Sequence, residues 1–522
     1  MAERPGPAEA LAPRAVLLGR RVPTGRDEDG RRRPGPGRSR TGRSRAGRAG
    51  AAAAAAALLL AGCHGPAAER PIAGAGSSAA SSVGAPAEAA PADERSTALQ
   101  RLLDARAAAV LAHDVDGVLA LVDPGAAAFR ERQERTVLGL ARVPLAAWSY
   151  EVVGEGPRLA EDRRAELGGT AWVADVRLRY RVEGVDVVDQ QRQRSFTVVE
   201  RGGTWLLADD VDGPSRPDVW DLGAVDVVRG SRTLVVGTAP RPVLEQQAAL
   251  GDAAAERVDA VWGTAWPRTT VVVVPDDADQ LVRLLGREDA AGLDQVAALT
   301  TGADRSSGAP GAAGAVDRVI VNPAALDVLG ELGREVVLTH ETTHVAVRAG
   351  AAADPPPWLS EGFAELVAYE GAGLGPDVAA ADLLSEVRAG RGPAAPPSAA
   401  DFDPAVGAVA PAYSAAWLAV RTVDRRHGRA ALLELMRAAS GRAAGAGAGD
   451  QTAGDQGAGD QSAEEGTAEG EGLRVAPLPL AEAVPRVLGV DLDVLTAQWR
   501  EDLAALAGVD APEVPATSGD GG

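Results

Sequence analysis

The sequence contains no lysine and only one cysteine among its 522 residues. A single cysteine excludes an internal disulfide bond and any metal site built from several thiolates. Because lysine is absent, arginine supplies the positive side chains, and the chain still has a net charge of -20. A protein this acidic does not have the charge expected of a nucleic-acid-binding protein. We therefore expect no nucleic-acid partner.

The one cysteine closes a short apolar run. Residues 31–48 are strongly basic, and the run at 51–60 that follows is too short to span a membrane. This order of basic, apolar and small residues is that of a secretory signal. The ending Leu60-Ala61-Gly62-Cys63 resembles the bacterial lipobox. The resemblance implies that Cys63 receives a lipid and that the protein is extracytoplasmic and anchored to the cell membrane. The alternative is an alanine-rich leader with a chance cysteine.

The chain is too long for one ordinary core, so we expect more than one domain. Composition divides it into a signal region, a tether rich in Ala, Pro, Ser and Gly, two folded domains and a polar tail. The second domain is interrupted by a low-complexity segment rich in Gly, Ala, Asp and Gln. The predicted boundaries are 1–62, 63–94, 95–217, 218–508 with the low-complexity segment at 440–472, and 509–522.

The first domain is expected to combine helix and antiparallel sheet. Apolar residues at helical spacing predict one helix over 95–117, and strict alternation predicts a strand over 171–182. Residues 148–153 have strand character, and 194–210 have the pattern of a hairpin. This α+β pattern resembles the small cone-shaped domains of the SnoaL-like or nuclear-transport-factor class. Such domains can be enzymes, ligand pockets or spacers; without an acid–base pair here, we interpret this one as a spacer or partner-binding domain.

In the second domain, the sequence His340-Glu341-Thr342-Thr343-His344 predicts a metal site on a helix. Residues four apart share one face of a helix, so both imidazoles can reach one ion. The glutamate after the first histidine can then take a proton from the attacking water. The alternative is two unrelated histidines on a helix, because two histidines alone make an incomplete site.

A second segment completes the pattern. Residues 358–365, Trp-Leu-Ser-Glu-Gly-Phe-Ala-Glu, resemble the second zinc-binding helix of gluzincin metallopeptidases, most of all the Peptidase MA-like families. The resemblance implies a mainly helical peptidase domain with a small sheet, one Zn²⁺ ion, and Glu361 as the third ligand beside His340 and His344. It also implies that Glu365 orients a ligand histidine, although a solvated charge is the alternative.

The same resemblance points to a tyrosine downstream. Tyr413 lies 52 residues past Glu361, at the start of a helical segment, where members of this clan place a group that stabilises the oxyanion. Packing of its own helix is the alternative role for Tyr413.

These residues predict a zinc-dependent peptidase with a peptide or protein substrate. The exopeptidase element of the aminopeptidase relatives is absent from the sequence, which favours an endopeptidase. One alternative is a non-catalytic surface lipoprotein that uses a zinc-stabilised fold as a protein-binding module. Another is a purely structural zinc, although such a site needs no glutamate at position 341. The sequence leaves the oligomeric state open.

Overall fold

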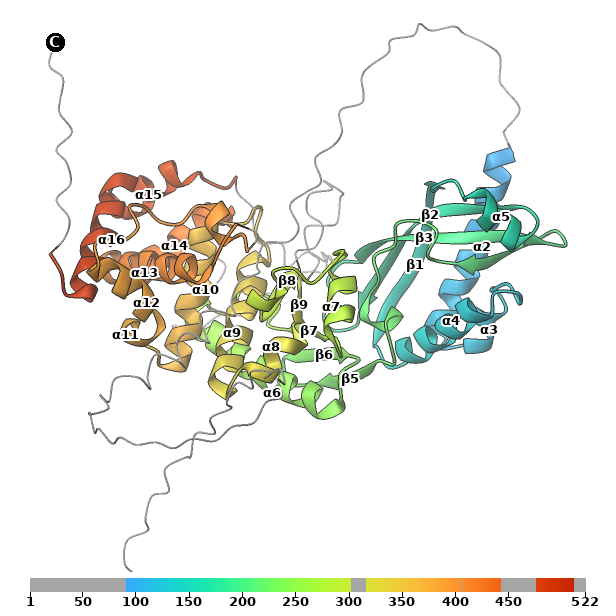
Figure 1. The fold of residues 1–522 in the computed structure, drawn as a ribbon, viewed down its shortest axis with the longest axis horizontal. Helices are drawn as coiled ribbons and strands as arrows, with labels where there is room; N and C mark the ends of the chain where they lie inside the picture. The colour runs from blue at the N-terminus through green and yellow to red at the C-terminus, as the bar shows by residue number, and fades with distance from the viewer. Residues whose placement is uncertain (1–90, 302–315, 405, 443–475, 511–522) are drawn as a thin grey trace, which may run out of the picture. The chain divides into compact units, whose positions relative to one another are not determined.

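The computed structural model describes residues 91–301, 316–404, 406–442 and 476–510 (Figure 1). These residues form helices together with a four-stranded and a five-stranded sheet. Cys63, the signal region and nearly all of the predicted tether lie outside the described residues, as do most of the low-complexity segment and of the tail. No helix in the described ranges has the length and apolar character that a membrane crossing requires.

The first sheet is antiparallel, and its strands follow one another in chain order. Its members are β1 (Leu145–Glu155), β2 (Ala171–Val182), β3 (Gln190–Arg201) and β4 (Thr204–Asp209). Strand β2 is the one that strict alternation predicts, and it keeps the predicted bounds. The predicted hairpin is also confirmed, since β3 and β4 are joined through Gly202 and Gly203, whose φ angles of 59° and 85° favour glycine.

Four helices accompany this sheet: α2 (Pro91–Leu111), α3 (Val115–Leu119), α4 (Ala127–Leu140) and α5 (Glu161–Leu167). The prediction of one helix over 95–117 is wrong at both ends. The helix begins inside the predicted tether, and it stops before His113, whose φ of 56° is left-handed. Asp114 then caps a new helix, because its carboxylate accepts a hydrogen bond from the Gly117 amide at 2.9 Å.

Aromatic rings fill the buried face of the first sheet. Trp148, Tyr150, Tyr180 and Trp220 are each at most 6% exposed, and Trp148 lies 5.8 to 6.1 Å from the other three ring centres. Such contacts contribute about 0.5–1.5 kcal/mol each beyond burial. The sheet and its helices agree with a mixed class of helix and sheet, and the finer likeness to SnoaL-like domains stays a prediction.

The second sheet is mixed, in the order β5-β6-β7-β9-β8. Its strands are β5 (Asp226–Arg229), β6 (Thr233–Gly237), β7 (Thr270–Val274), β8 (Ala298–Thr301) and β9 (Arg318–Val321). The central three run parallel, and the two edge strands run antiparallel to them. Runs of β-branched residues explain the buried central strands. Helix α6 (Arg241–Trp262) leads from β6 to β7, and α7 (Ala278–Leu284) follows β7.

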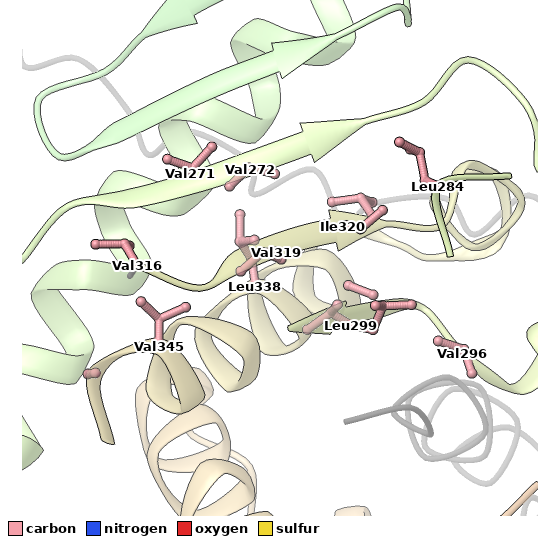
Figure 2. Packing of buried hydrophobic residues seen from close by; sticks show 14 of the residues in the cluster. Val271, Val272, Leu284, Val296, Leu299, Val316, Val319, Ile320, Leu338 and Val345 are labelled. Carbon is pink, nitrogen blue, oxygen red and sulfur yellow. The ribbon is translucent and has the colours of Figure 1, made fainter. Parts of the chain in front are cut away.

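Helix α9 (Glu331–Arg348) packs on this second sheet, after the short α8 (Pro323–Val328). Figure 2 shows Leu338 and Val345 of α9 on the side of the helix that faces Val319 of β9. All three side chains are at most 2% exposed. Burying such a side chain contributes about 1.5–3 kcal/mol, so this packing fixes α9 against the sheet.

The remaining α-helices follow α9 in the chain, and α10 packs both on α9 and on α13. They are α10 (Pro357–Ala372), α11 (Pro376–Ala379), α12 (Ala381–Arg388), α13 (Ala410–His427), α14 (Arg429–Ser440), α15 (Leu480–Leu488) and α16 (Leu492–Ala507). The described residues also form the 3₁₀ turns η1 (Val219–Asp221), η2 (Leu293–Gln295) and η5 (Ala399–Phe402). As predicted, the helices beyond the low-complexity segment pack back on the domain. Thr422 of α13 donates to Asp502 of α16 at 2.9 Å, and His427 contacts Gln498 at 3.0 Å.

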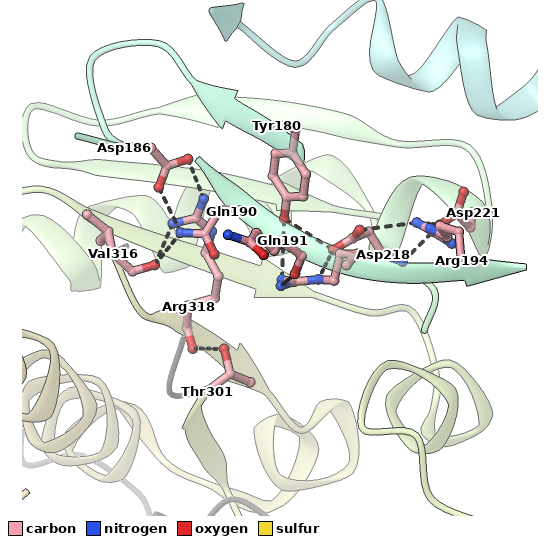
Figure 3. Close-up of polar contacts among 11 residues, drawn as sticks. Tyr180, Asp186, Gln190, Gln191, Arg194, Asp218, Asp221, Thr301, Val316 and Arg318 are labelled. Carbon is pink, nitrogen blue, oxygen red and sulfur yellow. Dashed lines mark hydrogen bonds and ion pairs between the residues drawn. The ribbon is translucent and has the colours of Figure 1, made fainter. Parts of the chain in front are cut away.

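A buried ion pair joins the first sheet region to the second sheet. Figure 3 shows Arg318 of β9 with the Asp186 carboxylate, at 2.7 Å, where the two side chains are 6% and 0% exposed. Gln190 of β3 donates to the Val316 carbonyl at 3.0 Å in the same cluster. Loss of one partner from a buried pair costs about 3–5 kcal/mol of stability, so we expect removal of either Asp186 or Arg318 to destabilise the folded protein strongly.

Candidate metal centre

Helix α9 carries the two histidines of the sequence motif on one buried face. His340 and His344 are four residues apart, so one ring lies a turn above the other. Every residue from Val336 to Arg348 is buried, and the two histidines are 0% and 1% exposed. Buried polar groups are costly unless they have partners. The burial of this polar face therefore indicates that its groups bind one another or a common ligand.

Helix α10 brings a third group to this face. It begins at Pro357, whose fixed φ suits the first helical turn, and Glu361 follows one turn later at 2% exposure. A methyl group on the next residue, Gly362, would collide with the main-chain carbonyl of Ala416 on α13. Glycine thus allows α10 and α13 to meet at backbone distance. This close contact holds Glu361 beside the histidines.

Three potential ligand atoms meet between the two helices. His340 Nε2 lies 3.1 Å from His344 Nε2 and 3.2 Å from Glu361 Oε2, and His344 Nε2 lies 3.3 Å from the same oxygen. Zinc bonds of about 2.0–2.1 Å in a tetrahedral site place neighbouring ligand atoms about 3.3 Å apart. The triangle fits that spacing. These three residues can hold a metal ion, and they come from the two segments named by the sequence.

The charge of the cluster also fits a cation. Glu341, Glu361 and Glu365 are 1%, 2% and 0% exposed, and all three belong to this pair of helices. When all three are ionised, these carboxylates carry more negative charge than two imidazoles can balance, and uncompensated charge is costly in a protein interior. A divalent cation bound to His340, His344 and Glu361 would neutralise most of it.

The pKa values of the ligands reflect the same electrostatics. Burial alone lowers the pKa of His340, but the hydrogen bond to Glu361 and the charges of Glu365, Glu361 and Glu341 raise it to about 9. Burial pushes the pKa of Glu361 upward, yet the charge of His344 and its hydrogen bonds to both histidines hold it well below the ordinary value. The site is therefore built to favour positive charge at its centre.

Glu365 lies one turn after Glu361, on the other side of the first histidine. Its Oε1 is 3.9 Å from His340 Nδ1, and the side chain is 0% exposed, so it is not a solvated charge. Burial raises the pKa of Glu365 to about 7, although His340 and the Tyr369 hydroxyl act in the opposite direction. The position suits a group that fixes the orientation of the imidazole ring, and that role stays a prediction.

Glu341 is held by a residue of the second sheet. The Thr300 hydroxyl of β8 donates to Glu341 Oε2 at 2.6 Å, and it lies 3.2 Å from the Glu341 carbonyl oxygen. Glu341 is adjacent to His340 in the chain and is 1% exposed. The carboxylate that the sequence assigns as a proton acceptor is thus hydrogen-bonded to a strand of the second sheet, and its charge contributes to the raised pKa of His340.

Tyr413 lies in the first turn of α13, and its ring centre is 6.1 Å from that of His340. The ring also packs edge-on against Phe402 at 5.1 Å and is 2% exposed. Both sequence-based roles remain compatible with this position, which is near the ligands and inside the core. The role in oxyanion stabilisation therefore stays a prediction.

The sequence did not single out Thr300, Arg348 or Tyr369. Arg348 lies one turn after His344, and that spacing on the motif helix was an available signal. Tyr369 lies one turn after Glu365 on α10, so its helical spacing from Glu365 was likewise an available signal. Thr300 is in a four-residue strand. Its partner is 41 residues away, so no local pattern connects the two.

Comparisons with known proteins add a coarse likeness. No family model matches the sequence, and neither does any curated protein. Among solved structures, a mutant of a two-domain M1 zinc metallopeptidase bound to L-arginine is similar, with a TM-score of 0.28 and 16% identity. The match covers 66% of this chain and 63% of that one, so the chain spans less than two thirds of the relative's length. The candidate site is therefore defined by its own geometry.

Proposed function

We propose that this protein is a zinc-dependent metallopeptidase that hydrolyses peptide bonds. One observation carries the proposal: His340, His344 and Glu361 present three atoms 3.1 to 3.3 Å apart, and Glu341 directly follows His340 in the chain. Three protein ligands leave a tetrahedral ion with a position for water or substrate, which is the pattern of a catalytic zinc site. A structural zinc usually has four protein ligands and needs no neighbouring base.

Each residue then has a defined task. Zinc, when bound, would polarise the scissile carbonyl and make water a better nucleophile. Glu341 accepts the proton of the attacking water and delivers it to the departing amine. Tyr413 donates a hydrogen bond to the oxyanion that develops on the substrate carbonyl. Glu365 keeps the His340 ring turned toward the ion.

Endopeptidase activity and membrane anchoring belong to the same proposal. The exopeptidase element of related aminopeptidases has no counterpart in the sequence, which supports cleavage within chains. The lipobox-like Leu60-Ala61-Gly62-Cys63 supports an extracytoplasmic enzyme attached to the cell membrane through a lipid. Its substrates would then be peptides or proteins outside the cytoplasm.

A peptide-library screen of the purified full-length protein tests the activity. We expect cleavage within peptides, loss of cleavage with a zinc chelator, and recovery on addition of one equivalent of zinc. Product masses will distinguish internal cleavage from trimming at the ends. A protein that binds zinc but cleaves nothing across the library would favour the alternative function, a zinc-stabilised protein-binding module.

Cys63→Ser is expected to release the full-length protein from membranes, because the thiol is the only atom to which this lipid can be attached. Membrane fractionation and incorporation of a labelled fatty acid measure the change. Ser81→Ala in the tether is the matched control and should stay in the membrane fraction. Retention of the Cys63→Ser protein in that fraction would contradict lipid anchoring at this residue.

A further inference from the structure

Thr300 of the edge strand β8 is hydrogen-bonded to α9, the helix that carries His340, Glu341 and His344. β8 pairs with β9 alone among the described strands, and Thr300 lies opposite Val319 in that pairing. Thr300 is nevertheless 1% exposed, because α9 covers its side chain. Its hydroxyl therefore belongs to the interior of the site and not to the outer edge of the sheet.

The contact from this hydroxyl to Glu341 is a strong one. The distance from Thr300 Oγ1 to Glu341 Oε2 is 2.6 Å, which is in the range of about 2.5–2.7 Å for a hydroxyl bound to a carboxylate. The proton transfer needs one carboxylate oxygen, so a hydrogen bond to Oε2 restrains the group without removing its function. A glutamate side chain otherwise rotates about several bonds, and restraint of this rotation favours the reactive orientation.

Helix α9 also holds the main chain of the same threonine. Arg348 Nη1 donates to the Thr300 carbonyl at 3.3 Å. The Arg348 guanidinium is in turn near the Asp317 carboxylate at 3.7 Å and the Asp354 carboxylate at 3.4 Å. Thr300 thus meets α9 at two places, one turn on either side of His344. Because these contacts fix the position of Thr300, its hydroxyl restrains the position of the Glu341 carboxylate.

We infer that Thr300 is a positioning residue for the Glu341 carboxylate in the hydrolytic step. The inference rests on the proposed function, since it assigns Glu341 the proton transfer. Thr300 itself contacts neither the ligand triangle nor the substrate in this assignment. Thr300 acts through Glu341, so we expect it to change the rate of the chemical step and not the affinity for substrate.

The substitution Thr300→Val removes the hydroxyl and keeps the shape of a β-branched strand residue. We expect kcat to fall about 10- to 100-fold, because a misplaced catalytic group loses rate on this scale. KM, the zinc content and the melting temperature should stay close to wild type, because Thr300 contacts neither substrate nor metal and a loss of stabilisation confined to the transition state lowers kcat without changing KM. Steady-state kinetics, metal analysis and thermal denaturation provide the measurements.

Two further variants separate the hydroxyl from packing. Thr300→Ser and Thr300→Ala both lose the methyl group, and only serine keeps the oxygen. Serine should therefore retain kcat within a few-fold while alanine matches valine. This comparison also holds if valine lowers stability. Thr301→Val is the control on the neighbouring position, where the hydroxyl donates to the Arg318 carbonyl of β9 at 3.2 Å, and it should keep the wild-type rate.

The outcomes distinguish this inference from the proposed function. If the wild-type protein shows no chelator-sensitive cleavage, the proposed function is wrong and the inference falls with it. If wild type is active and Thr300→Val or Thr300→Ala keeps the wild-type kcat, only the positioning role is wrong. Equal losses in the serine and alanine variants would likewise overturn it, because packing and not the hydroxyl would then matter.

Discussion

Glu341→Gln is expected to abolish hydrolysis and to leave bound zinc in place. Glutamine has nearly the same shape, and its amide oxygen can still accept the Thr300 hydrogen bond that the structure shows at 2.6 Å. An amide cannot accept the proton of the attacking water, however, and general acid–base groups contribute about 10²- to 10⁴-fold to rate. The ligand triangle of His340, His344 and Glu361 does not include residue 341, so metal affinity should be preserved.

The measurement is kcat/KM on the best peptide of the library, with zinc counted in the same samples. Glu331→Gln is a matched control, since it removes an exposed carboxylate from the first turn of the same helix. It should keep activity and zinc. A Glu341→Gln protein that cleaves at the wild-type rate would show that another group accepts the proton. Loss of zinc from that variant would show that Glu341 has a larger part in the metal site than we propose.

Glu361→Ala is expected to remove both zinc and activity. The substitution leaves two histidine ligands, which make an incomplete zinc site, and it takes away the one carboxylate that contacts both rings, at 3.2 and 3.3 Å. Even residues that merely orient zinc ligands contribute about 10- to 100-fold to affinity, so loss of a ligand should exceed 100-fold. Competition with a chromogenic chelator measures the affinity.

Stability gives a second measure of the same change. A ligand present at about 100 times its dissociation constant stabilises the folded state by about 2.7 kcal/mol, and this gain should disappear in Glu361→Ala. Glu370→Ala is the control on the same helix, because that exposed residue pairs with Arg429 and lies away from the site. It should keep the zinc-dependent rise in melting temperature. A similar rise in Glu361→Ala would mean that zinc binds elsewhere.

The sequence predicted the parts of the site that depend on local spacing. His340 and His344 share a helical face by periodicity alone, and resemblance to a second helix added Glu361. The structure brings those three side chains together. Strand β2 was predictable because apolar and polar residues alternate along it, and the break at His113 was not, because apolar spacing does not report a left-handed φ.

The remaining features depend on tertiary contacts. Burial of Glu365 follows from the packing of α10 between its neighbours, and a helix by itself is equally consistent with an exposed carboxylate. Gly362 also depends on tertiary packing. Glycine has a low propensity for the interior of a helix, and it is needed at position 362 because the main chain of Ala416 on α13 lies too close for a larger side chain. The contact between Thr300 and Glu341 joins a strand of the second sheet to α9, so it exists only in the folded domain. Such residues are identified by the fold and not by their neighbours in the chain.

The buried pair of Asp186 and Arg318 limits how this gene can evolve by recombination. A replacement first half that covered Arg318 without offering a carboxylate would leave a buried and unpaired guanidinium, at a cost of about 3–5 kcal/mol. That is a large share of the 5–15 kcal/mol or so by which a typical domain is stable. Inheritance of the two halves as one unit is therefore favoured, and exchange of the first half for an unrelated module would require a compensating change at position 318.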